Sequence, residues 1–199
     1  MLPVDVVVKT SDAKFFGTHL QNLESYAEGF PPESLAKDKT INHMNIDEDS
    51  EVASLMLHLM HRQPQPDLQN IPIRVLVELA EAVEKYLIYS SIGTCRFIMS
   101  IRASEAPLLV LAYALKHGYQ DVADCAAPHS LGTPLKAVKK ELGPTGTALW
   151  VSCPSTLFIR FFTRSYRRQS IVNPSSYFIN IVVLWMFLSM KTNHPNVTS

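Results

Sequence analysis

Residues 72–89, which read PIRVLVELAEAVEKYLIY, contain the clearest periodic pattern in the chain. Their apolar side chains recur at spacings of three and four, which places them on one face of an α-helix. Pro72 suits the first turn of such a helix, and the charged side chains fall mostly on its other faces. The pattern predicts an amphipathic helix that runs to about Tyr89, with an apolar face of Ile73, Leu76, Val77, Ala80, Val83 and Leu87.

Helices are also predicted on both sides of this segment. The acids and the hydroxyl of residues 47–51 favour a helix N-terminus, and the apolar positions that follow repeat at helical spacing until the prolines at 64 and 66. Gly118 and Pro128 are well placed to end two further helices. The helices expected downstream cover residues 91–102, 107–117 and 121–127.

The first part of the chain predicts a small β-sheet. Residues 4–8 are rich in β-branched valine, and residues 11–14 are turn formers, so we expect a β-hairpin. A helix should follow from His19 to Phe30 and end at the two prolines after it. Residues 33–46 are ambiguous, with a polar loop followed by a segment at 40–46 that is compatible with a strand. Consecutive amphipathic helices beside a small sheet imply an α+β domain.

The charges of the chain are unevenly distributed. The chain has 199 residues, 47% of them hydrophobic, and a formal net charge of zero. This length excludes a multi-domain enzyme, and this hydrophobic content excludes a largely disordered chain. Residues 1–141 hold all 18 acids and 13 bases, a net charge of −5, whereas residues 142–199 hold five bases and no acid, a net charge of +5. The neutral total argues against a nucleic-acid-binding protein.

The acid-free C-terminal part allows three interpretations. Periodicity weakens after Pro128, apart from a short helical pattern at 135–142, and we predict a domain boundary near residue 145. Residues 171–190 carry no formal charge and are long enough to cross a bilayer. The four arginines between residues 160 and 168 would then keep the main domain in the cytosol. The alternatives are a packed C-terminal helix or strand, and a tail that is not selected for structure, such as translated non-coding sequence.

The cysteines and the N-terminal sequence indicate an intracellular protein. No basic segment followed by an apolar run stands at the N-terminus, so we expect no secretory signal. Cys95, Cys125 and Cys153 are widely spaced and include no Cys-x-x-Cys pair, which argues against a disulfide framework and against a zinc knuckle. We therefore expect reduced thiols in an intracellular protein of the cytoplasm or nucleus, or in a membrane protein whose domain faces the cytosol.

Catalytic signatures are missing from the sequence. It contains no phosphate-binding loop, no nucleophile elbow, no dinucleotide fingerprint and no His-Glu-x-x-His pair. His58 and His61 would share a helical face as zinc ligands do, but no third ligand accompanies them at a suitable spacing. We interpret them as surface or helix-end histidines, and we assign no catalytic, cofactor-binding or metal-binding residue.

Glu78, Glu81 and Glu84 would form an acidic ridge along the helix predicted at 72–89. Lys85 lies four residues after Glu81, at a spacing that allows an i,i+4 ion pair worth about 0.3 kcal/mol. We favour a solvated helix face over a patch on which a partner docks.

A set of short motifs occurs in the order found in a known family. They are Asp5-Val6 in the hairpin, then Ser11-Asp12-x-x-Phe15 and His19, then Asp49-Ser50-Glu51-Val52 before an apolar run, then Asp67-Leu68, then Leu76-x-x-Leu79-Ala80-x-Ala82-x-x-Lys85-Tyr86, and finally Cys95. This order resembles a BTB/POZ domain over roughly residues 4–140. Three stretches, at 62–68, 80–86 and 112–119, are similar to the fungal branch of that family.

The resemblance implies an α+β interaction domain at residues 1–105, followed by a helical extension at 106–145. Residues 146–199 are a basic, apolar tail that resembles nothing in that family. The resemblance also implies association with a second copy or with another protein. The chain could act as an adaptor that binds a cullin scaffold, without catalysis and without cofactors. Two features depart from the family. The chain begins just before the hairpin, which puts a swapped dimer in doubt, and no hydrophobic-x-acid motif lies between Gln63 and Ile73.

Two other functions compete with this interpretation. A tail-anchored membrane protein that binds partners is one, and a metal-dependent enzyme, disfavoured by the missing motifs, is the other. Whatever the function, Tyr86 and Cys95 are expected in the core. A large ring with one polar end suits a half-buried site, and cysteine behaves as a small hydrophobic residue.

Overall fold

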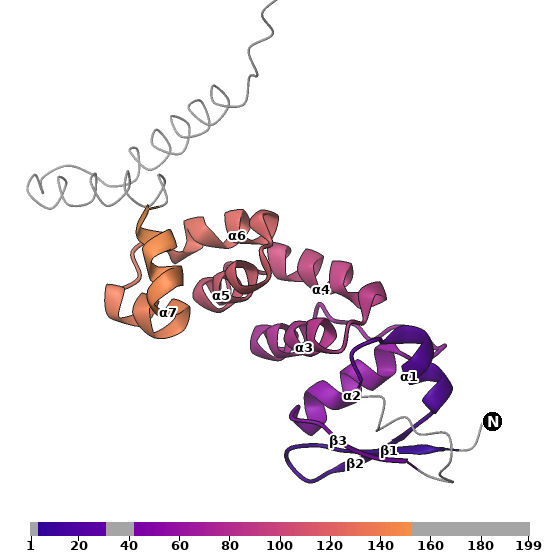
Figure 1. The fold of residues 1–199 in the computed structure, drawn as a ribbon. Helices are drawn as coiled ribbons and strands as arrows, with labels where there is room; N and C mark the ends of the chain where they lie inside the picture. Colours follow the sequence, from indigo (N-terminus) through magenta and orange to yellow (C-terminus); the bar gives the residue numbers. More distant parts are fainter. Residues whose placement is uncertain (1–3, 31–41, 153–199) are drawn as a thin grey trace, which may run out of the picture. The chain divides into compact units, whose positions relative to one another are not determined.

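The computed structural model describes residues 4–30 and 42–152, and these residues form an α+β fold (Figure 1). Its sheet has the strand order β2-β1-β3. Strand β1 (Val6–Lys9) pairs antiparallel with β2 (Phe15–Thr18), which confirms the predicted hairpin. Strand β3 (Asn42–Asn45) pairs parallel with β1, with Val6 opposite Asn42. The segment that was compatible with a strand is therefore the third strand of the sheet.

The predicted helices are present. Asp49 caps α2 by accepting a hydrogen bond from the Val52 backbone N–H at 2.9 Å. Gly118 ends α5 in the left-handed conformation, with a φ of 74°. The helices are α1 (Leu20–Tyr26), α2 (Ser50–Leu59), α3 (Ile73–Lys85), α4 (Tyr89–Ile101), α5 (Pro107–His117), α6 (Gln120–Ala126), the short 3₁₀ helix η2 (Ala127–Ser130) and α7 (Leu135–Ser152).

Two helices are shorter than predicted, because the backbone leaves the helical conformation before the apolar pattern ends. Helix α1 stops at Tyr26, and the Gly29 N–H then donates to the Tyr86 carbonyl at 2.9 Å. The two backbone segments lie so close there that a Cβ on Gly29 would stand 2.5 Å from the Lys85 carbonyl oxygen. Helix α3 stops at Lys85 because Leu87 adopts a positive φ of 53°. Tyr89 therefore begins α4 instead of ending α3.

A single apolar core joins the sheet to the helices, and Tyr86 and Cys95 belong to it as expected, with 4% and 1% of their surfaces exposed. The Tyr86 ring stacks on Phe30 with 4.3 Å between ring centroids, and its hydroxyl donates to Glu48 Oε2 at 2.8 Å. Burial, together with the Glu48 carboxylate, raises the pKa of Tyr86 to about 12.

Helix α7 runs through the domain boundary predicted near residue 145. Gly143 has a φ of 63° and kinks the helix, after which Pro144 opens its second half. Trp150 in that half is 3% exposed, and its Nε1–H donates to Ser130 Oγ at 2.7 Å. The described residues belong to one compact unit, and positions 105 and 145 both lie within it. Within the described part of the chain, no helix is long and apolar enough to span a membrane. The segment 171–190 lies outside the described residues.

The two cysteines of the described residues differ in exposure, and their reactivities should differ accordingly. Cys95 is buried and Cys125 is exposed. Burial, with the Glu84 carboxylate as a smaller cause, raises the pKa of Cys95 to about 12, so its thiol stays protonated near neutral pH. In a Cys153→Ser variant we expect an aromatic disulfide reagent to titrate one thiol in the native chain and both after unfolding. Immediate reaction of both thiols in the native chain would contradict this assignment.

Candidate interaction surface

Helix α4 carries large apolar side chains on its outer face. Its inner face is buried through Ser91, Cys95, Ile98 and Met99. On the outer side Tyr89, Phe97 and Ile101 are 58%, 66% and 66% exposed. We call these three residues the α4 row. Surface helices usually carry polar residues on this face, and exposed apolar residues that are neighbours, unlike single ones, are typical of interaction sites.

Phe97 and Ile101 are one turn apart on α4 and therefore adjacent, as residues at i and i+4 are. Gly93 lies between Tyr89 and Phe97 at the same spacing, and a Cβ placed there would meet no atom within 4 Å. At Gly93, therefore, no other described residue covers this face of α4. A partner could approach the backbone of α4 closely at this glycine.

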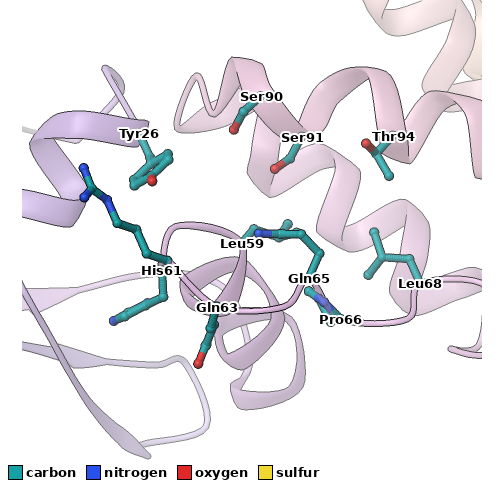
Figure 2. A pocket seen from close by; sticks show the side chains of 11 residues that line it. Tyr26, Leu59, His61, Gln63, Gln65, Pro66, Leu68, Ser90, Ser91 and Thr94 are labelled. Atoms are coloured by element: carbon teal, nitrogen blue, oxygen red, sulfur yellow. The ribbon is translucent and has the colours of Figure 1, made fainter.

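A groove lies beside the same helix (Figure 2). It has a volume of about 600 Å³ and is bounded on one side by Ser90, Ser91 and Thr94 of α4. Thr94 lies three residues before Phe97, at a spacing that makes the two residues neighbours on the helix surface. The opposite wall is formed by Tyr26 of α1 and by residues 59–68, the end of α2 and the loop after it, with Arg62 as the charged residue of the lining.

The loop that forms this wall is held in place by hydrogen bonds. His58 Nε2 lies 2.8 Å from the Pro64 carbonyl oxygen, and His61 Nδ1 lies 2.6 Å from the Leu57 carbonyl oxygen. Arg102 Nη1 donates to the Ile71 carbonyl at 2.7 Å. His58 thus contacts the backbone of the loop after α2, and His61 contacts the backbone of the last turn of α2. Among the described residues, no three His, Cys, Asp or Glu side chains are grouped so that they could hold a metal ion.

The acidic ridge of α3 differs from its prediction. Glu78 forms an i,i+4 ion pair with Arg74 at 2.8 Å, whereas the other two acids contact α5 and the residues after it. Glu81 Oε2 accepts from Lys116 Nζ at 2.6 Å and lies 3.0 Å from His117 Nε2. The ridge is therefore a polar seam between α3 and α5 along much of its length, although the Glu81 side chain is still 32% exposed.

Glu84 lies deeper in the same seam. Its Oε1 accepts hydrogen bonds from the Tyr113 hydroxyl of α5 at 3.0 Å and from the Tyr119 hydroxyl at 2.5 Å. The expected ion pair between Glu81 and Lys85 does not form, because Lys85 Nζ reaches Asp47 and Glu48 instead, each at 2.9 Å. Glu84 thus ties three segments together, and its carboxylate is occupied by the protein itself.

A second polar link was missed by sequence reasoning. The Arg96 guanidinium of α4 donates to both carboxylate oxygens of Asp121 at 2.9 Å and lies over the Tyr119 ring, 3.8 Å from its centroid. The hydrogen bonds from Arg96 hold the pKa of Asp121 below its ordinary value. This link fixes α4 against α6. The α4 row therefore stands on a helix whose position is well determined.

Comparison of the sequence with known proteins identified no relative. No protein-family model matches the chain, and no curated protein is significantly similar to it. The surface that stands out by its own chemistry is the α4 row, together with the groove beside the same helix.

Proposed function

We propose that this chain is a non-enzymatic protein-interaction module of BTB/POZ type, active inside the cell, which associates with a second copy of itself through the outer face of α4. The observation that carries the proposal is the α4 row, in which Phe97 and Ile101 are each 66% exposed. The α+β arrangement of an N-terminal hairpin beside consecutive helices supports it, because it agrees with the family that the sequence motifs resemble.

The energetics of the row are adequate for association. Burying one large apolar side chain contributes about 1.5–3 kcal/mol, and a few aromatic or aliphatic anchors commonly dominate an interface. A pair of copies in which each buries Phe97 and Ile101 would satisfy this requirement, since an interface with two-fold symmetry uses the same patch twice. The groove beside Thr94 would then receive the side chains at the edge of the contact.

Light scattering of the full chain tests self-association. We expect the wild-type chain to have the mass of a dimer at micromolar concentration, and we expect a variant with Phe97→Asp and Ile101→Asp to have the mass of a monomer, because two charges would be buried without partners. Phe15→Asp is the matched control: Phe15 is 65% exposed but lies on β2. A wild-type chain that stays monomeric, or a Phe15 variant that dissociates equally, would contradict the proposal.

Adaptor work on a cullin scaffold is an extension of the same function. The segment between Gln63 and Ile73 lacks the hydrophobic-x-acid motif expected of cullin-binding members. A pull-down with a purified cullin N-terminal domain, repeated with the Phe97→Asp and Ile101→Asp variant, tests this extension. Capture by the wild-type chain alone would support it, and no capture by either would limit the function to self-association.

A membrane-tethered form of the module is a second candidate, favoured by the twenty residues without formal charge at 171–190. Carbonate extraction of cells that express the full chain separates the two candidates. Recovery in the membrane pellet would support the tether, and complete recovery in the supernatant would exclude it.

A further inference from the structure

A second groove lies between α2, α3 and α5 and shares no lining residue with the groove beside α4. Its volume is about 690 Å³. Apolar side chains from all three helices contribute to its lining: Val52 from α2, Val77 and Ala82 from α3, and Leu109 and Ala112 from α5. This hollow is large enough for several side chains of a bound segment, and its apolar part would be covered by such a segment.

The charges around this groove are predominantly negative. Its lining includes five carboxylates, those of Asp47, Glu48, Asp49, Glu78 and Glu81, but only two ammonium groups, those of Lys85 and Lys116. The formal excess is therefore three negative charges. Asp47 is the most accessible of the paired acids, with 94% of its side chain exposed, and 42% of the Glu78 side chain is exposed. Ion pairs as exposed as these contribute little to stability, so a basic side chain of a partner can replace the lysine or arginine that now pairs with each acid.

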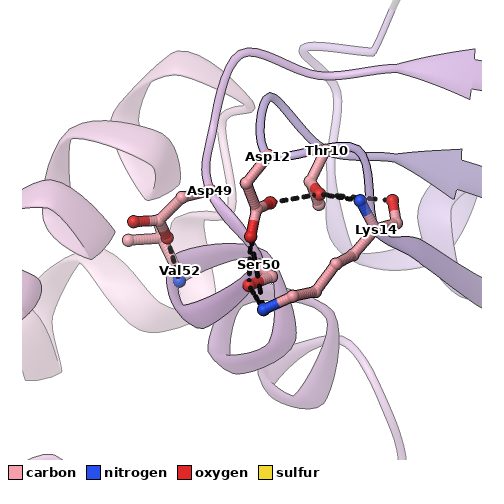
Figure 3. Close-up of polar contacts among 6 residues, drawn as sticks. All are labelled: Thr10, Asp12, Lys14, Asp49, Ser50 and Val52. Atoms are coloured by element: carbon pink, nitrogen blue, oxygen red, sulfur yellow. Dashed lines mark hydrogen bonds and ion pairs between the residues drawn. The ribbon is translucent and has the colours of Figure 1, made fainter.

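One end of the groove is held rigid by a network between the β1–β2 turn and the start of α2 (Figure 3). The Ser50 hydroxyl donates to Asp12 Oδ2 at 2.7 Å, and Lys14 Nζ donates to Ser50 Oγ at the same distance. Thr10 Oγ1 donates to Asp12 Oδ1 at 2.6 Å. In addition, the backbone N–H of Ser11, which lines the groove, donates to the Glu48 carbonyl at 3.0 Å. These bonds hold the β1–β2 turn against the start of α2, next to Ser11 and Asp49 of the groove lining.

We infer that this groove binds an extended segment of a partner protein that carries Arg or Lys side chains spaced by apolar ones. The basic side chains would reach the exposed carboxylates of Asp47 and Glu78, and the apolar ones would cover Leu109 and Ala112. The net charge of −5 on residues 1–141 would attract such a segment over a longer range. This inference concerns a different surface from the proposed self-association and does not depend on it.

Binding of a labelled peptide to the full chain tests the inference. The probe is a short fluorescein-labelled peptide of alternating Arg and Leu, and the reference is the same peptide with neutral citrulline at each Arg. We expect the Arg peptide to bind the wild-type chain more tightly than the citrulline peptide. We expect a variant with Asp47→Lys and Glu78→Lys to bind it about tenfold more weakly, because reversing charges at a docking site replaces attraction with repulsion.

The matched control changes the total charge by the same amount elsewhere. Glu28→Lys with Asp124→Lys alters two exposed acids that do not line the groove, and we expect it to bind the Arg peptide within about twofold of wild type. Ala112→Leu, which fills the apolar part without changing any charge, should also weaken binding. Circular dichroism verifies the fold of each variant, and Asp47→Asn replaces the double variant if that one does not fold.

Three results would overturn the inference. They are a wild-type affinity for the Arg peptide weaker than about 1 mM, equal binding of the Arg and citrulline peptides, and equal losses in the groove variant and its control. Because the α4 residues are unchanged in all of these variants, light scattering reports separately whether self-association holds.

Discussion

Replacing Trp150 with alanine is expected to lower the free energy of unfolding by about 3–5 kcal/mol, the cost typical of removing a large buried aromatic side chain. The Trp150 side chain is 3% exposed and contributes to the apolar core. Its loss would also leave the buried Ser130 hydroxyl without the hydrogen bond that it now accepts at 2.7 Å. Urea denaturation followed by circular dichroism measures the change.

Leu149→Ala is the matched control for this prediction. Leu149 is the preceding residue of the same helix but is 52% exposed, so its truncation should change the free energy of unfolding by less than about 1 kcal/mol. Equal effects of the two substitutions would show that the second half of α7 does not pack on the core. A chain truncated at residue 145 should behave like the Trp150 variant or worse, because it lacks the whole second half of α7.

Helix α7 continues across the boundary predicted near residue 145, for a reason that lies in two particular residues. Gly143 and Pro144 are usual punctuation between elements, and the loss of acids after Glu141 pointed the same way. In the structure Gly143 breaks the helix with a positive φ of 63°, and Pro144 stands where a helix can begin. The residues that predicted the end of the domain therefore start a helical segment that returns to the core. Sequence alone does not distinguish these two uses.

Local signals predicted local structure well, while partners far apart in sequence were not predicted. The acids before α2, the Gly118 terminator and the proline breaks each act within a few residues, and the elements that they bound are present. The capping group of α2 is the Asp49 carboxylate and not the Ser50 hydroxyl that the sequence suggested. By contrast, Gly29 meets Tyr86, and Arg96 meets Asp121, across long separations. The local sequence around these residues does not indicate which distant residue each of them contacts.

The candidate surfaces show the same limit. The helix at 91–102 was predicted, but its exposed face depends on which side packs against α3 and α6. A row of Tyr89, Phe97 and Ile101 has the composition of a core face, and only the fold shows that it is exposed. Likewise, Glu81 and Glu84 have the spacing of a solvated ridge, because a polar seam between two helices and a surface stripe have the same sequence pattern.

Substituting Glu84 with leucine is expected to lower the free energy of unfolding by about 2–4 kcal/mol. The Tyr113 side chain, which is 2% exposed, and the Tyr119 side chain both donate to Glu84 Oε1. Without that acceptor the Tyr113 hydroxyl stays buried and unpaired, and hydrogen bonds to charged groups are among the stronger ones. Urea denaturation at neutral pH measures the change.

Two controls separate the hydrogen bonds from the volume of the side chain. Glu84→Gln keeps an oxygen acceptor and should cost less than Glu84→Leu. Glu78→Gln, on the exposed part of the same helix, should be within about 0.5 kcal/mol of wild type. If Tyr113→Phe and Tyr119→Phe are each combined with Glu84→Leu, the losses should be less than additive, because each pair shares one interaction. Fully additive losses would contradict the proposed seam.

Alkaline pH provides an independent measure of the same seam. Burial and the Glu84 carboxylate raise the pKa of Tyr119 to about 12, and the same two causes raise the pKa of Tyr113 above its ordinary value. The unfolded chain therefore releases these protons first, near pH 10, so their contribution to stability is complete below pH 10 and declines as the pH rises toward the folded values. In Glu84→Gln the carboxylate no longer opposes ionisation, and the decline between about pH 10 and pH 12 should be shallower. An unchanged slope would mean that burial alone holds the two tyrosines neutral.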